Sequence, residues 1–277
     1  MAFDEADRSF RTPDGLWLAA TLTTPSAPVQ GGVVLVHGGG VTRDEAGFFT
    51  RLAHGLAQRG VAVLRFDLPG HGESQGRQED LGLAALLNAM DAALGALRSW
   101  TGVARPSLLA ASFSGGAAAY YAARRPAGLD RLVLFNPLLD YKKRFVDEKP
   151  FWDNDFLTED AAQRLSEQGF LEHSPTFRLG RAILNEVFWI VPREVLADIV
   201  APTFIVHGTG DTFIPVDSSR RAVAELKCEH RLLELDGAQH GLAVHDDPTY
   251  ADPQTQAWQA EVIAAVGDWL GASGPVS

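Results

Sequence analysis

The chain has 277 residues, of which 46% are hydrophobic and 21% charged, with a formal net charge of −11. This composition is typical of a folded globular protein with a sizeable core, and the negative charge disfavours nucleic acid and anionic membranes as partners, because both are bound by clustered Lys and Arg. The single cysteine, Cys228, excludes an internal disulfide and has no spaced partners for a zinc site.

The amino-terminal residues predict an edge hairpin rather than a targeting segment. Acidic residues stand where a secretory signal has basic ones, no apolar core follows them, and no run reaches the length of a membrane span. We therefore expect a cytoplasmic location. Further on, Ser9–Thr12 and Leu16–Thr23 flank Pro13-Asp14-Gly15, and Asp-Gly is typical of a tight turn between antiparallel strands.

Apolar runs of strand length then alternate with amphipathic segments of helix length. Because this alternation is typical of a parallel sheet wrapped by helices, we predict an α/β fold with a mostly parallel central sheet of about eight strands flanked by helices. The predicted parallel strands are Gly32–His37, Val61–Asp67, Ser107–Ala111, Leu132–Asn136, Thr203–His207 and Arg231–Asp236. The predicted helices lie near residues 46–59, 80–100, 115–125, 217–227 and 255–270.

Residues 137–202 break this rhythm, because aromatic residues are spaced irregularly among charged ones over more than the length of an ordinary connection. We predict a helical lid inserted after the sixth strand, so that 1–136 and 203–277 form the core and 137–202 the lid. Its rings serve either a small core of the lid itself or an apolar acyl or aryl pocket. The candidates for that pocket are Phe151, Trp152, Phe188 and Trp189.

A sharp strand-to-helix turn is predicted within Ala110–Gly116. A nucleophilic serine on such a turn needs small residues two positions before and after it, and Ser114 has Ser112 and Gly116 there. Ser112 also has small flanks and is the alternative. We favour Ser114 as the nucleophile because two glycines follow it, whereas Ser112 would place the bulky Phe113 at the oxyanion position.

A serine nucleophile requires a histidine base and a carboxylate that orients it. Asp211 and His240 follow the last two predicted strands, which gives the chain order Ser, Asp, His. The alternative acids are Asp217 and Asp140, and His245 is the competing histidine. The same side chains show no spacing typical of a metal site.

The glycine-rich loop after the first parallel strand is the expected source of a second oxyanion donor. Backbone N–H groups aimed at the carbonyl oxygen stabilise the charge that acyl transfer develops there, and our candidates are the N–H groups of Gly39 and Gly115. A tight turn or a phosphate cradle is the alternative, although the loop lacks a Walker lysine and the dinucleotide spacing of glycines.

With Ser114, Asp211, His240 and the His-Gly-Gly loop in place, the chain resembles the α/β-hydrolases over nearly all of its length outside the lid. Residues 64–74 resemble a loop behind the active site in many members of that family. Within it, the sequence is similar to bacterial feruloyl and cinnamoyl esterases and to acyl-carrier thioesterases. It departs from the common pattern in having Ser112 where a glycine usually stands.

These residues predict a serine hydrolase that cleaves an ester or thioester of a hydrophobic acyl or aryl group through an acyl-enzyme, with no cofactor and no metal. The alternatives are an acyltransferase or carbon–carbon bond hydrolase with the same triad, and a non-catalytic ligand receptor on the same fold. The expected partner is a small-molecule substrate. The basic patch of Lys142, Lys143 and Arg144 is either a solvated face or a contact for coenzyme A or an acyl carrier. The oligomeric state is left open.

Overall fold

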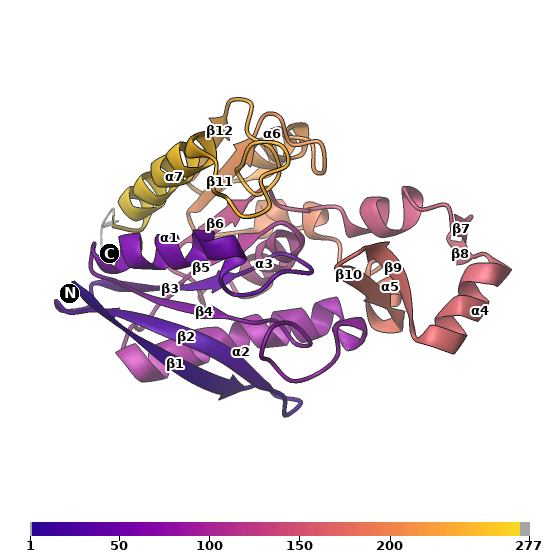
Figure 1. The fold of residues 1–277 in the computed structure, drawn as a ribbon, viewed down its shortest axis with the longest axis horizontal. Coiled ribbons are helices and arrows are strands. Elements are labelled where there is room, and N and C mark those ends of the chain that lie inside the picture. The colour runs from indigo at the N-terminus through magenta and orange to yellow at the C-terminus, as the bar shows by residue number, and fades with distance from the viewer. Residues whose placement is uncertain (1, 272–277) are drawn as a thin grey trace.

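The computed structural model describes residues 2–271, and its centre is a twisted eight-stranded sheet (Figure 1). The strand order is β1-β2-β4-β3-β5-β6-β11-β12. β1 pairs with β2 and β2 with β4 in antiparallel fashion, and all other neighbours are parallel. The predicted α/β fold is therefore confirmed.

The edge hairpin is longer than predicted. β1 (Phe3–Arg11) pairs along its whole length with β2 (Trp17–Pro25), and most side chains of β1 are exposed. Four of the first six residues of β1 are charged, which suits an unpaired sheet edge because charge discourages the docking of another strand.

The six parallel strands lie close to their predicted positions. They are rich in Val, Leu and Ile, and all but the edge strand β12 are almost entirely buried, as expected where helices cover both faces of a sheet. Their bounds are β3 (Gly31–Val36), β4 (Val61–Phe66), β5 (Ser107–Ala111), β6 (Leu132–Phe135), β11 (Thr203–Gly208) and β12 (His230–Leu235).

Helices cover the two faces of the sheet and give each face its own hydrophobic core. α1 (Phe48–Ala57) and α7 (Pro253–Gly271) pack on one face. α2 (Leu83–Thr101), α3 (Phe113–Arg124) and α6 (Asp217–Glu225) pack on the other. Among residues 2–271, no helix is both long enough and apolar enough to cross a bilayer.

The segment between β6 and β11 (residues 137–202, the insert) extends from one end of the sheet (Figure 1). The prediction that it is helical is wrong in part, because two short hairpins stand between its helices. Asn154 and Asp155 supply the left-handed turn of the first hairpin. The elements of the insert are η3 (Lys143–Asp147), β7 (Trp152–Asp153), β8 (Phe156–Leu157), α4 (Glu159–Gln168), β9 (Phe170–Ser174), β10 (Phe177–Gly180), α5 (Arg181–Glu186), η4 (Pro192–Glu194) and η5 (Leu196–Asp198).

The insert is tied to the core through η2 (Gln78–Asp80). The side chain of Gln78 donates to the carbonyl of Thr176 at 2.9 Å and accepts from the N–H of Arg178 at 2.8 Å. Gly180 lies so close to this segment that a Cβ atom there would stand 1.6 Å from the carbonyl oxygen of Glu79. The second hairpin of the insert is therefore held beside the carboxyl ends of the central strands.

Candidate active site

Ser112 occupies the sharp turn between β5 and α3. Its φ is 51° and its ψ is −119°, a conformation that L-residues avoid and that is typical of a nucleophile on a strand-to-helix turn. The backbone holds it there: its N–H donates to Phe135, and its carbonyl accepts from Gly115 at 3.0 Å and from Leu138 at 2.9 Å.

The prediction that Ser114 occupies this turn is wrong. Ser114 lies in the first turn of α3, is 0% exposed, and donates its hydroxyl to the carbonyl of His37 at 2.6 Å. Ser112 is half-buried, and its Oγ lies 2.9 Å from Nε2 of His240. The helix begins at Phe113, earlier than the two glycines indicate, because the Phe113 ring is buried against the rings of Tyr141 and Phe177.

Asp211 and His240 meet as the sequence predicts. Nδ1 of His240 lies 2.7 Å from Oδ2 of Asp211, so the ring donates from Nδ1 and Nε2 is free to accept the Ser112 hydroxyl proton. The other carboxylate oxygen of Asp211 accepts the N–H groups of Phe213 and Ile214 at 2.8 and 2.9 Å. The Asp211 side chain is 0% exposed, so its orientation is fixed.

The charge state of Asp211 follows from these contacts. Burial by itself would raise the pKa of Asp211, but hydrogen bonds from His207 and His240 and the N–H of Ile214 hold that pKa well below its ordinary value. Asp211 is thus an anion at neutral pH. It can fix the tautomer of His240 and stabilise the imidazolium that forms when His240 takes a proton.

The alternative acids and the alternative histidine lie elsewhere. Asp217 pairs with Arg220 at 2.9 Å, and Asp140 pairs with Arg193 at 3.2 Å. His245 is exposed beside Asp246. Within residues 2–271, no cluster of three or more His, Cys, Asp or Glu side chains is arranged to hold a metal ion.

The oxyanion candidates fare differently. The prediction for Gly115 is wrong, since its N–H already donates to the carbonyl of Ser112. With Ser112 on the turn, the residue that follows it is Phe113, whose N–H begins α3 and makes no hydrogen bond within the described chain. The N–H of Gly39 is likewise unpaired within residues 2–271. The preceding Gly38 packs so closely that a Cβ there would lie 3.3 Å from Cβ of Ser112.

Two buried histidines shape the loop that carries Gly39. His37 donates from Nδ1 to the carbonyl of Gly38 at 2.7 Å and accepts the N–H of Leu68 at Nε2. Because the peptide unit is planar, fixing the carbonyl of Gly38 also fixes the N–H of Gly39. His71 accepts the N–H of Gly40 at 3.2 Å. Burial lowers the pKa of His37 to about 3 and also lowers that of His71, so both rings are neutral and can accept these bonds.

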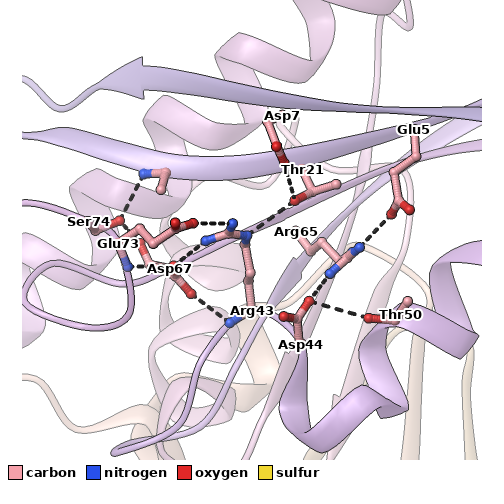
Figure 2. A network of polar contacts seen from close by, with 11 residues as sticks. Glu5, Asp7, Thr21, Arg43, Asp44, Thr50, Arg65, Asp67, Glu73 and Ser74 are labelled. Carbon is pink, nitrogen blue, oxygen red and sulfur yellow. Dashed lines mark hydrogen bonds and ion pairs between the residues drawn. The ribbon is translucent and has the colours of Figure 1, made fainter.

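A polar network fixes the continuation of the same loop (Figure 2). The buried Asp67 accepts the backbone N–H of Arg43 at 2.7 Å and pairs with its guanidinium, which also pairs with Glu73. Beside it, Arg65 joins Glu5 on the edge hairpin to Asp44 on the loop. The charged edge of the sheet thus anchors the loop that carries Gly39.

Two rings lie beside Gly39 and His240. The ring of Phe177 on β10 would meet a Cβ at Gly39 at 3.0 Å, and the Phe213 ring lies 4.9 Å from that of His240. His173 lies between these two rings, edge-on to both, at 6.0 and 6.2 Å. Burial, reinforced by the charges of Lys149 and Arg144, lowers the pKa of His173 to about 3, so this ring is also neutral. Together, Phe177, His173 and Phe213 form an aromatic wall.

The four predicted pocket residues do not form this wall. Trp189 is 82% exposed, so the prediction for it is wrong. Trp152 and Phe188 pack edge-to-face against each other at 5.8 Å, and with Phe151 they rest on the core beneath the insert. These three rings therefore serve the packing of the insert, which was the alternative interpretation of its aromatic residues.

The predicted basic patch is neutralised by neighbouring acids. Lys142 pairs with Asp147 and Asp155, and Lys143 and Arg144 both lie within 4 Å of Glu148. Arg144 also covers the ring of Phe213, with its guanidinium carbon 3.9 Å from the ring centre. This pairing favours the solvated face over a phosphate contact.

The sequence profile of the family described as "Serine aminopeptidase, S33" matches residues 27–247. The chain belongs to this family of α/β-hydrolases. A relative, the monoacylglycerol lipase of Mycolicibacterium smegmatis, is 26% identical over 250 residues, which cover 81% of this chain and 85% of that protein.

Solved structures agree with this assignment. The monoacylglycerol lipase of Paleococcus ferrophilus superposes with a TM-score of 0.64 at 25% identity, over 98% of this chain and 99% of that one. Est1E from Butyrivibrio proteoclasticus, solved with ferulic acid bound, superposes with a TM-score of 0.75 at 20% identity, over 94% and 99%. The S33-family chain is thus an ester-cleaving type of α/β-hydrolase, and the likeness to Est1E concerns the fold.

Three parts of the site escaped the sequence analysis: Phe113, Phe177 and Glu45. Phe113 follows from the usual rule once Ser112 is recognised on the turn, because the residue after the nucleophile supplies a donor. Phe177 reaches the site only through the pairing of β9 with β10, which no pattern in the insert indicates. Glu45 lies in an irregular loop and faces the same cavity as Ser112 and His240.

Proposed function

We propose that the protein is a serine hydrolase that cleaves carboxylic esters through an acyl-enzyme on Ser112. The observation that carries this proposal is the continuous chain of contacts from Ser112 Oγ to His240 at 2.9 Å and from His240 to Asp211 at 2.7 Å. The strained backbone of Ser112 and its partial exposure support the same role.

In the first half-reaction, Ser112 Oγ attacks the ester carbonyl carbon while His240 Nε2 takes the hydroxyl proton. The N–H groups of Gly39 and Phe113 stabilise the oxyanion, a contribution of several kcal/mol for donors of this kind. His240 then gives the proton to the leaving alcohol. In the second half-reaction, water releases the acid and Ser112 recovers its proton.

We propose substrates with an apolar acyl or aryl part and a small leaving alcohol. Three features support this class: the aromatic wall of Phe177, His173 and Phe213 beside Gly39 and His240, a monoacylglycerol lipase among the relatives, and Est1E with ferulic acid bound among the similar folds. A thioester of the same acyl group would meet the same nucleophile and donors, so it belongs to the substrates to be tested.

A fluorophosphonate probe and a substrate panel test the proposal. Intact mass spectrometry should show one label per wild-type chain, one label on Ser114→Ala and none on Ser112→Ala. The panel comprises p-nitrophenyl esters of graded chain length, monoacylglycerols, methyl ferulate and acyl thioesters. Labelling of Ser112→Ala at the wild-type rate, or wild-type protein that neither takes the label nor turns over any ester, would overturn the proposal.

A further inference from the structure

Glu45 lies in a strained turn beside Ser112 and His240. The mechanism above gives it no role. Glu45 and Ala46 have φ values of 47° and 49°, and Gly47 follows at 85°, so three successive residues are left-handed. Only glycine adopts this conformation readily. Non-glycine residues in such conformations persist where their surroundings hold them, and they cluster at functional sites.

In the part of the chain that the structure describes, the carboxylate of Glu45 has no cation partner, although cations are close in sequence and space. Arg43 pairs with Asp67 and Glu73, and Arg65 pairs with Asp44, the residue next to Glu45 (Figure 2). Within residues 2–271, Glu45 itself forms no ion pair and accepts only the N–H of Gly38, at a long 3.5 Å. Glu45 is thus not part of the polar network, and its carboxylate retains lone pairs for another donor.

Glu45 faces a small cavity that reaches the reacting groups. The cavity has a volume of about 20 Å³, and its polar lining residues are Glu45, Ser112, Asn136, His240 and Tyr250, with apolar side chains that include Phe48. A space of about 10–15 Å³ or more on this measure holds one water, provided that polar partners surround it. This cavity is therefore large enough for one water.

The titratable groups that line the cavity can both donate hydrogen bonds to a water and accept them from it. Burial raises the pKa of Glu45 to about 7, and the other titratable groups that line the cavity are His240 and Tyr250. Burial and the charge of Glu45 raise the pKa of Tyr250 to well above its ordinary value, so this hydroxyl stays protonated and can donate. A water between these groups would find both acceptors and a donor.

We propose that Glu45 holds the water that hydrolyses the acyl-enzyme, an inference that rests on the proposed function of Ser112. The water oxygen attacks the acyl carbonyl carbon while His240 Nε2 takes one of its protons, and Glu45 accepts a hydrogen bond from the other. The bond between the carbonyl carbon and Ser112 Oγ then breaks. His240 returns the proton to Ser112 Oγ, and the free acid leaves.

The test separates acylation from deacylation. Glu45→Gln keeps the size of the side chain and Glu45→Ala removes its polar end. Stopped-flow mixing with a p-nitrophenyl ester gives the acylation rate, and intact mass spectrometry of a pre-formed acyl-enzyme gives its decay. We expect acylation within about threefold of wild type and decay at least about tenfold slower in Glu45→Ala. Glu167→Gln, an exposed carboxylate on α4 that contacts Gln163, is the matched control and should decay at the wild-type rate.

Competition with an added nucleophile gives a second readout. If Glu45 positions water and not the acyl group, hydroxylamine should capture a larger share of the acyl group in Glu45→Ala than in wild type. Acyl-enzyme decay and partition that both match wild type would overturn the inference while the Ser112 label stays intact. An equal fall of acylation and decay would also overturn it, because Glu45 would then support the loop of Gly38. Failure of the proposed function itself is recognised separately, by the absence of a Ser112 label in wild type.

Discussion

Ser114 donates its hydroxyl to the main-chain carbonyl of His37 at 2.6 Å, which joins the first turn of α3 to the loop that carries Gly39. The serine two positions after Ser112 thus holds in place the loop that we propose supplies an oxyanion donor. Both residues are fully buried, so neither the hydroxyl nor the carbonyl has water as a substitute partner. We therefore assign the two serines separate tasks, catalysis to Ser112 and support of this loop to Ser114.

Replacing each serine in turn should separate these tasks. Ser112→Ala removes the nucleophile, so kcat should fall by about 10⁴-fold or more while the free energy of unfolding changes little. Ser114→Ala leaves the His37 carbonyl unpaired and should lower the free energy of unfolding by about 1–3 kcal/mol, with most of the activity retained. Ester hydrolysis and urea unfolding measure the two effects, and an inactive but stable Ser114→Ala would contradict this division.

The contact between Asp211 and His240 predicts a large kinetic effect without loss of the fold. In Asp211→Asn the amide cannot stabilise an imidazolium and favours the wrong tautomer of His240, so kcat should fall by about 10⁴-fold. Asp217→Asn is the matched control, because Asp217 pairs with Arg220 on the surface and its loss should leave kcat within about twofold. Equal losses in the two variants would contradict the assignment.

The close approach of Phe177 to Gly39 predicts a coupled pair. A methyl group at Gly39 would stand 3.0 Å from the ring, so Gly39→Ala should displace either the loop or the ring and lower kcat/KM by about tenfold or more. Gly39→Ala combined with Phe177→Leu should recover much of this loss, since the smaller side chain leaves room. A double variant as impaired as the sum of the single ones would show that the two residues act independently.

The buried histidines predict a loss of stability in mild acid. The pKa of His37 is about 3 in the fold against an ordinary 6.5, so the unfolded chain binds the extra proton between these values. The free energy of unfolding should therefore decrease as the pH falls below 6.5, by up to about 1.4 kcal/mol per pH unit for this residue. His71 acts in the same direction. Urea unfolding between pH 7 and 5.5 should show the slope, and His37→Asn should reduce it.

Glu45 should oppose the decrease in the free energy of unfolding that the buried histidines cause in acid. Its pKa is about 7 in the fold and 4.5 ordinarily, so the folded protein binds more protons than the unfolded chain between these values. Its contribution to stability consequently grows as the pH falls from 7 towards 4.5. Removing it in Glu45→Gln should steepen the decrease of stability with acid. The same urea series measures this, and a slope unchanged from wild type would contradict the raised pKa.

The pairing of Arg43 with the buried Asp67 predicts that the network in Figure 2 supports both stability and catalysis. Arg43→Met leaves the charge of Asp67 uncompensated and should lower the free energy of unfolding by about 3 kcal/mol, with a fall in kcat as the loop of Gly39 loosens. Adding Asp67→Asn should restore part of the stability because the buried charge is gone. No recovery in the double variant would contradict this explanation.

The fold could be predicted because its core strands are continuous apolar runs. Such strands are stable only where helices cover both faces of the sheet. β5, β11 and β12 lie close to where the sequence indicates, and their carboxyl ends determine where the turn at Ser112 and the loops of Asp211 and His240 meet. The chain order and these loops were therefore enough to place Asp211 beside His240.

The wrong serine was placed on the turn because two serines with small flanks stand two residues apart. The glycines after Ser114 indicate a tight turn, yet they serve α3 instead. Gly116 is pressed against the Leu138 carbonyl and the Tyr141 ring, where a Cβ would stand 2.2 Å from the nearer atom. Gly115 is similarly close to Pro137. Their small size allows the insert to cross the helix, a tertiary contact that local sequence does not reveal.

The contacts between η2 and the second hairpin of the insert limit the ways in which substrate selectivity can change. Gln78 forms hydrogen bonds with both Thr176 and Arg178, and Gly180 lies against the Glu79 carbonyl with no room for a side chain. These contacts hold β10 against the core, so the position of the Phe177 ring is fixed. Selectivity would then change by substitution of individual aromatic side chains, while the backbone of the hairpin that carries them stays in place. Swapping the whole segment would instead disturb the amide donors beneath it.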